Sequence, residues 1–90
     1  MNYLISRHRV ENFETWYRAF ASGEDAQRAA GLHLLHLLRD ADDLDVVVMF
    51  FRVDDLDAAR AYAAERQGAR ADTGVVGETE FTVLSDHSGR

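Results

Sequence analysis

The chain has 90 residues, the size of one domain, and its 47% of hydrophobic residues is typical of a globular protein. A net charge of −6 without a basic patch argues against a nucleic-acid partner, and the lack of cysteine excludes disulfides and thiolate chemistry. No apolar run approaches the roughly 20 residues that span a bilayer and no signal peptide is visible, so we expect a cytoplasmic protein.

Residues 3–10, YLISRHRV, alternate as a strand does, with Leu4, Ser6 and His8 on one side. Asn12 is a suitable N-cap for a following helix, whose aromatic residues recur at i, i+3, i+4 and i+7: Phe13, Trp16, Tyr17 and Phe20. Ser22 and Gly23 interrupt this pattern, helical EDAQRAA follows, and Gly31 predicts the end of the helix.

The clearest strand of the chain is LDVVVMFFRV, residues 44–53. Asp54 or Asp55 caps a second helix, which ends at Gln67-Gly68 and carries one face of Leu56, Ala59, Tyr62 and Ala63. Residues 78–85, ETEFTVLS, form a final strand. We therefore predict one domain over residues 1–86 and a flexible tail over 87–90 that includes His87.

Residues 31–40, GLHLLHLLRD, are compatible with a helix or a strand. The glycine before them and the acidic turn after them favour a short hairpin strand. In a regular strand, His33 and His36 point to opposite faces because their separation is odd. We expect one of them, with His36 favoured, to look into an enclosed space.

The elements then follow the order β-α-β-β-α-β, the α+β ferredoxin-like arrangement. Its two helices cover one face of a four-stranded antiparallel sheet, and the other face is bare. Both sets of alternating residues in 46–53 are apolar, so the bare face is predicted to be apolar as well. Such a face needs a partner, and a second copy packed sheet against sheet would close a barrel around a cavity.

The stretches HRV-x-NF-x-x-W, RDADD, VVVMFFRVDDLDAARAY and GVVGE resemble the dimeric α/β-barrel superfamily. Within it, the chain is similar to small bacterial proteins called cyclases and to antibiotic-biosynthesis monooxygenase-like barrels. The resemblance spans residues 3–84 and implies a homodimer that binds a hydrophobic small molecule and needs no metal or organic cofactor. Where relatives commonly carry an acidic residue or a tryptophan on the third strand, this chain has Arg52.

Three residues are candidates for catalysis. His8 and His36 can exchange protons near neutral pH, and His8 lies in the HRV stretch of the resemblance. Inside a cavity, Arg52 would stabilise an enolate or phenolate, whereas on the rim it would pair with a carboxylate. No metal site is expected, because no carboxylate ligand accompanies the histidines.

The residues expected to bind substrate are Trp16, Tyr17, Phe50, His33 and Tyr3. For the aromatic ones, packing in the core is the alternative. The favoured function is a cofactor-independent cyclase or isomerase acting on an aromatic or polyketide-like intermediate of natural-product biosynthesis. The alternatives are a cofactor-independent monooxygenase and a non-catalytic ligand-binding dimer module.

Overall fold

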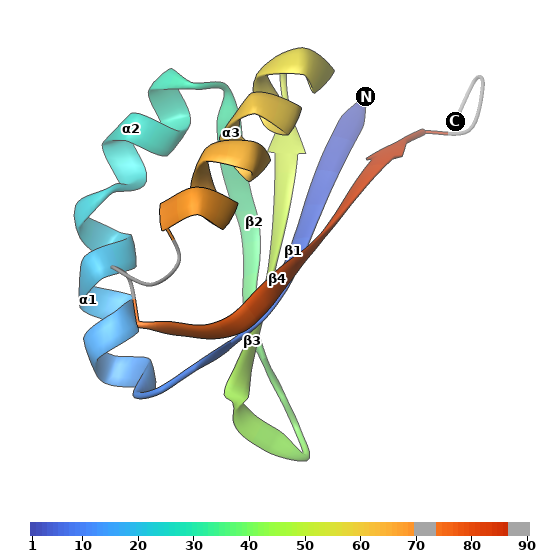
Figure 1. Ribbon diagram of the computed structural model, residues 1–90. Coiled ribbons are helices and arrows are strands. Elements are labelled where there is room, and N and C mark those ends of the chain that lie inside the picture. The colour runs from blue at the N-terminus through green and yellow to red at the C-terminus, as the bar shows by residue number, and fades with distance from the viewer. Residues whose placement is uncertain (70–73, 87–90) are drawn as a thin grey trace.

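The computed structural model describes residues 1–69 and 74–86, without the side chains of 67–69 and 78, and contains four strands and three helices (Figure 1). Their bounds are β1 Asn2–Val10, α1 Phe13–Ser22, α2 Glu24–Ala29, β2 Leu32–Asp40, β3 Asp43–Val53, α3 Leu56–Ala69 and β4 Val75–Ser85. The predicted order of elements is confirmed, with the first helix divided in two at Gly23. The tail over 87–90 and a short stretch over 70–73 lie outside the described residues.

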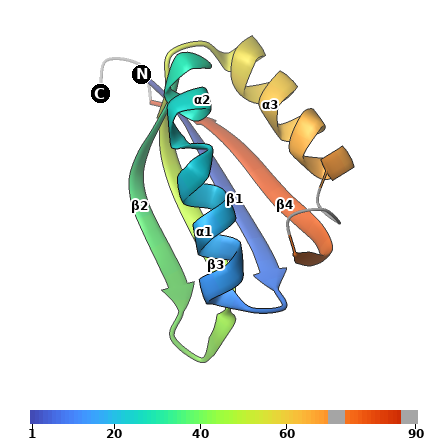
Figure 2. The same ribbon diagram turned by 90° about the vertical axis from the view of Figure 1, so that its left-hand side faces the viewer.

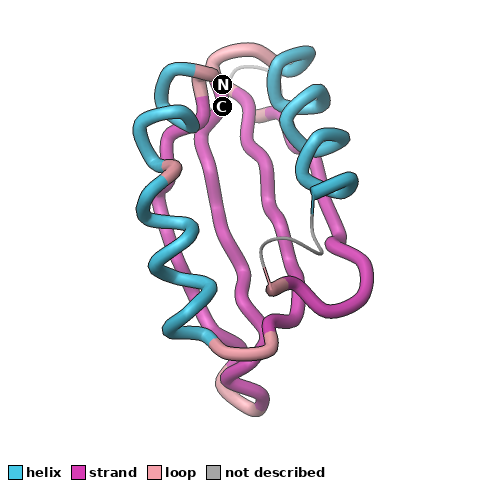
Figure 3. Tube along the Cα trace, turned by 60° about the vertical axis from the view of Figure 1, so that its left-hand side comes forward, coloured by secondary structure: helices cyan, strands magenta, loops and turns pink. Residues whose placement is uncertain are grey.

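The strands form one antiparallel sheet in the order β2-β3-β1-β4. All three helices lie on one face of this sheet, so the predicted ferredoxin-like α+β fold is confirmed (Figure 2). Helix α2 packs beside β2 and α3 beside β4, which leaves the helices along two sides of the sheet (Figure 3). No helix in the described part of the chain is long and apolar enough to cross a membrane.

Helix α1 begins as its sequence indicates. The Asn12 side chain accepts a hydrogen bond from the Thr15 backbone amide at 3.0 Å, which satisfies one of the free donors of the first turn. Trp16 and Phe20 are buried against the sheet, but Tyr17 remains 40% exposed and stacks on Phe13 with ring centroids 5.8 Å apart. The apolar stripe of α1 is therefore narrower than the sequence suggests.

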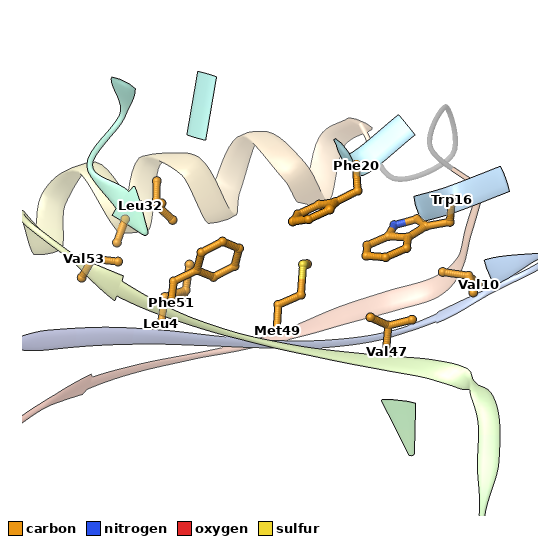
Figure 4. Close-up of a cluster of buried hydrophobic side chains, with 10 residues drawn as sticks. Leu4, Val10, Trp16, Phe20, Leu32, Val47, Met49, Phe51 and Val53 are labelled. Atoms are coloured by element: carbon orange, nitrogen blue, oxygen red, sulfur yellow. The ribbon is translucent and has the colours of Figure 1, made fainter. Parts of the chain in front are cut away.

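The hydrophobic core lies between the helices and the sheet. Figure 4 shows Val47 and Met49 of β3 pointing toward Trp16 and Phe20 of α1. At the other end of the sheet, Leu4, Leu32 and Phe51 are the largest fully buried apolar side chains. Each of them stabilises the fold by about 1.5–3 kcal/mol through the removal of apolar surface from water.

Strand β2 contains a β-bulge that overturns one prediction. The pairing with β3 shifts between Leu34 and His36, so that His33 lies opposite Arg52 and His36 lies opposite Phe50. Since Phe50 and Arg52 are two residues apart, they share a face, and both histidines lie on that face with them. The prediction of opposite faces is wrong because the bulge inserts one residue between the histidines.

The bare face of the sheet, which we call the outer face, is largely apolar as expected. Its half-buried side chains include Tyr3, Ile5, Val48 and Phe50, and its strand edges expose Leu38 and Leu84. Two ion pairs cross the end of the sheet near the β2–β3 turn, Arg7 to Asp40 at 2.9 Å and Arg9 to Asp43 at 2.6 Å. Charged side chains therefore border the apolar surface at the turn.

The second half of the chain departs from its predicted bounds at two points. Helix α3 begins after Asp55, whose side chain accepts from the Asp57 amide at 2.9 Å, and it runs past Gly68 to Ala69. Strand β4 begins at Val75 instead of residue 78, because Gly77 adopts a positive φ of 74° and lets the strand bend without ending.

Candidate functional site

A cavity of about 290 Å³ lies between the sheet and the helices. Apolar and aromatic side chains from two helices and two strands form most of its wall: Trp16 and Phe20 of α1, Met49 of β3, Tyr62 of α3 and Phe81 of β4. Ser6 and His8 reach it from β1, the strand that shares the sheet's centre with β3. Its volume is near the lower end of the about 300–1,000 Å³ usual for ligand pockets, so it suits a ligand of a few fused rings.

Ser6 and His8 are buried polar residues on the floor of this cavity. Ser6 is 1% exposed and His8 is 5% exposed. Because side chains alternate along β1, both point toward the helices and away from the outer face. Among the described residues, neither Ser6 Oγ nor His8 Nε2 has a hydrogen-bond partner. An unpaired buried polar atom costs about 1–3 kcal/mol, so both atoms are available to hydrogen-bond a molecule in the cavity.

The same two atoms do not form a nucleophile and base. Because Ser6 Oγ is unpaired, it makes no hydrogen bond to the His8 ring, and the described residues supply no carboxylate partner for that ring. A hydrolase of the serine–histidine type needs both contacts. The pair therefore fits a binding or proton-transfer site instead.

His8 is held in its neutral form. Burial, with a smaller contribution from the positive charge of Arg66, lowers the pKa of His8 from 6.5 to about 4. The ring also lies against Trp16, with centroids 5.1 Å apart. At pH 7 the imidazole is thus neutral and can donate or accept a hydrogen bond inside the cavity.

Polar groups of α2 and α3 meet across the cavity. The Gln27 side-chain amide donates a hydrogen bond to the Tyr62 hydroxyl at 3.1 Å, and burial raises the pKa of Tyr62. Glu65 and Arg66 also line the cavity from α3, Glu65 being exposed and Arg66 half-buried. The cavity therefore combines an apolar interior with charged residues on one helix.

Two of the eight residues predicted for the site, His8 and Trp16, line this cavity. Tyr17 does not, because it lies on the exposed side of α1. The other five share the outer face of the sheet: Tyr3, His33, His36, Phe50 and Arg52. The described residues of one chain therefore form no single pocket that holds all eight.

The five outer-face residues form two groups of side-chain contacts. Phe50 makes edge contacts with Tyr3 and His36, at centroid distances of 5.5 and 6.0 Å. His33 Nε2 lies 2.9 Å from Asp54 Oδ2, and Arg52 lies 3.8 Å from the other oxygen of that carboxylate. The hydrogen bond from His33 is the main cause that lowers the pKa of Asp54. His36, predicted to be the more enclosed histidine, is exposed.

Sequence reasoning missed several residues of the cavity. Gln27, Met49 and Arg66 received no role, although Arg66 lies four residues after Tyr62 and so belongs on the same face of α3. Ser6 shared a predicted strand face with His8, which was the signal that could have assigned it to the site. In the described ranges, 1–69 and 74–86, no group of three His, Cys, Asp or Glu residues could hold a metal ion.

Proteins of known structure share this fold over nearly their whole length. An antibiotic biosynthesis monooxygenase-type protein from Nitrosomonas europaea is 20% identical, with a TM-score of 0.65 over 96% of this chain and 98% of that one. A conserved protein from Methanosarcina mazei Go1 is 8% identical, with a TM-score of 0.71 over 96% and 92% of the two chains.

A third structure is the monooxygenase from the gene ActVA-Orf6 of Streptomyces coelicolor in complex with the ligand nanaomycin D. It is 14% identical, with a TM-score of 0.59 over 99% of this chain and 89% of that one. No family model matches the sequence, and no curated protein matches it significantly. At these identities the likenesses show the fold, which is the ferredoxin-like fold of antibiotic biosynthesis monooxygenase proteins, as the resemblance implied.

Proposed function

We propose that this protein is an oxygenase that binds a small phenolic aromatic molecule in the cavity between sheet and helices. The observation that carries the proposal is the pair of unpaired buried atoms, Ser6 Oγ and His8 Nε2, on the floor of an aromatic-walled cavity. They can hydrogen-bond the hydroxyl groups of a phenol while Trp16 and Phe20 contact its rings. The fold, shared with proteins named monooxygenases, favours oxygenation over the cyclisation expected from the sequence.

The proposed reaction converts a ring C–H of an electron-rich phenol into a carbonyl. The ring carbon gives an electron pair to O₂ and forms a C–O bond, while the phenolic proton passes to His8 and on to the peroxide oxygen. The peroxide then loses water, so one phenol and one O₂ give one quinone and one H₂O. Neutral His8 is in the form that accepts the proton, and negative charge developing beside the ring raises its pKa during the step.

The test is oxygen uptake with a dihydroxynaphthalene, measured against the spontaneous oxidation of the substrate. With ¹⁸O₂ we expect one labelled atom in the quinone and one in water. His8→Gln should lower the rate by about 10²-fold, as expected for loss of a proton acceptor. The matched control is Arg18→Gln, which changes an exposed side chain of α1 that lines neither the cavity nor the outer face and should leave the rate unchanged.

Other outcomes lead to different functions. A rearranged product formed without oxygen uptake would contradict the oxygenase and support the cyclase or isomerase function. Binding without any turnover, unaffected by His8→Gln, would indicate a ligand-binding module.

We also propose that a second copy of the chain covers the outer face. The half-buried Ile5, Val48 and Phe50 form an apolar surface there, which a soluble monomer would leave in water. Phe50 is the centre of this surface because it contacts both Tyr3 and His36. Phe50→Asp should therefore give a monomer by light scattering, and a wild-type chain that is already monomeric at micromolar concentration would contradict the proposal.

A further inference from the structure

The charged residues of the cavity are unevenly placed. Glu65 and Arg66 are neighbours on α3, but Arg66 is half-buried whereas Glu65 is exposed. In the part of the chain that the structure describes, no carboxylate lies within 4 Å of the Arg66 guanidinium. A guanidinium that lines a cavity without an ion pair is free to bind an anion there.

We propose that the cavity holds its aromatic ligand as an anion, with Arg66 as the counter-ion and the Ser6 hydroxyl as a hydrogen-bond donor. This inference rests on the proposed function and names the chemical class of its substrate. The anionic group is a carboxylate or a second hydroxyl that is already ionised, since both present oxygen atoms that a guanidinium and a hydroxyl can bind. It is separate from the neutral hydroxyl whose proton passes to His8 in the proposed reaction.

The field of Arg66 reaches the interior of the cavity. Its positive charge acts to lower the pKa of two groups that line the cavity, His8 and Tyr62. A potential that opposes a cation at His8 favours an anion at the same place. The charge of Glu65 acts at Tyr62, whereas the charge of Arg66 acts at both Tyr62 and His8.

Ser6 and His8 complete the recognition without adding charge. The Ser6 hydroxyl can donate to an anionic oxygen, and the unpaired nitrogen of neutral His8 can accept a hydrogen bond from a neighbouring hydroxyl of the same ligand. A neutral aromatic ring with no hydroxyl or carboxylate would leave both atoms unpaired, and it would gain nothing from Arg66. Apolar contacts alone would then hold it, mainly those with Trp16 and Phe20.

The experiment uses the full chain and the fluorescence of Trp16, its only tryptophan, which lines the cavity. Three naphthalene probes are titrated at pH 7: neutral 2-naphthol, the carboxylate 2-naphthoate and the phenolate 2,4-dinitro-1-naphtholate. The wild-type chain should bind at least one anion about tenfold or more tightly than 2-naphthol, as a partly screened ion pair provides. The anion that is preferred identifies the ligand as a phenolate or a carboxylate.

Variants of α3 assign the preference to Arg66. Arg66→Gln should remove the preference for the anion and leave binding of 2-naphthol unchanged, whereas Arg66→Lys should retain most of it. The matched control Arg60→Gln removes a positive charge from the exposed side of the same helix and should retain the preference in full. Far-UV circular dichroism confirms that each variant is folded.

The two proposals fail in different ways. Equal binding of all three probes, or the same loss in Arg60→Gln as in Arg66→Gln, would overturn the anion inference and leave an aromatic-binding cavity. Absence of binding by every probe would overturn the aromatic cavity itself, and the inference with it.

Discussion

Replacing His8 with leucine should remove one defined part of the protein's sensitivity to acid. The folded chain holds this histidine neutral because it is buried, with a pKa of about 4, whereas the unfolded chain titrates it near 6.5. Between these two pH values the unfolded state binds more protons than the folded state. The contribution of His8 to stability is therefore fully present above pH 6.5 and is lost as the pH falls toward 4.

The size of the effect follows from the two pKa values. One pKa unit corresponds to about 1.4 kcal/mol, so protonation of His8 in the unfolded chain lowers the free energy of unfolding by about 3 kcal/mol at pH 4. His8→Leu lacks this loss because leucine does not titrate. At pH 7 the variant should be as stable as the wild type or slightly more so, since the unpaired Nε2 atom is gone.

Urea unfolding followed by far-UV circular dichroism at several pH values between 7 and 4 measures both chains, at equal concentration to keep any association the same. Protonation of carboxylates destabilises both chains in acid. The difference between the two free energies of unfolding at each pH therefore reports the contribution of His8. Parallel loss of stability in wild type and His8→Leu over this range would show that His8 is not a buried neutral histidine.

Three further predictions concern the fold. Phe51→Ala should lower the free energy of unfolding by about 3–5 kcal/mol in urea, because it empties a fully buried site, whereas Leu44→Ala at an exposed site should have little effect. Asn12→Ala should lower it by about 1 kcal/mol through loss of the cap on α1, while Asn12→Asp keeps an acceptor and should restore most of it. Gly31→Ala should be destabilised by at least about 1 kcal/mol in thermal or urea unfolding, since φ is +84° and the new methyl group lies 3.3 Å from the Asp54 Cβ; an unchanged stability would mean that this turn relaxes.

The strands and helices could be predicted because each has a local signal. The alternation of Leu4, Ser6 and His8 depends only on neighbouring residues, and the cap at Asn12 uses its own side chain. The orientation of β3 could not be predicted in the same way. Both of its alternating sets are apolar, so the sequence does not say whether Phe51 or Phe50 faces the helices. Arg52 lies on the same face as Phe50, so its position could not be predicted either.

The positions of His33 and His36 depend on a contact that no local pattern encodes. The bulge lies among consecutive leucines, and nothing in those residues marks which of them is unpaired. Only the pairing of β2 with β3 decides it. Arg66 was missed for a different reason: its spacing from Tyr62 was visible, but an arginine near the end of a helix is ordinarily read as a solvent-exposed charge.

The bulge in β2 also bears on how proteins of this kind can diverge. Strand β2 is at the edge of the sheet, so an inserted or deleted residue there disturbs one ladder of hydrogen bonds and none of the central pairing between β1 and β3. A single such event would exchange one of the histidines between the two faces while Ser6 and His8 kept their places. The surface proposed to meet a second copy and the cavity proposed to bind a ligand can therefore change independently of each other.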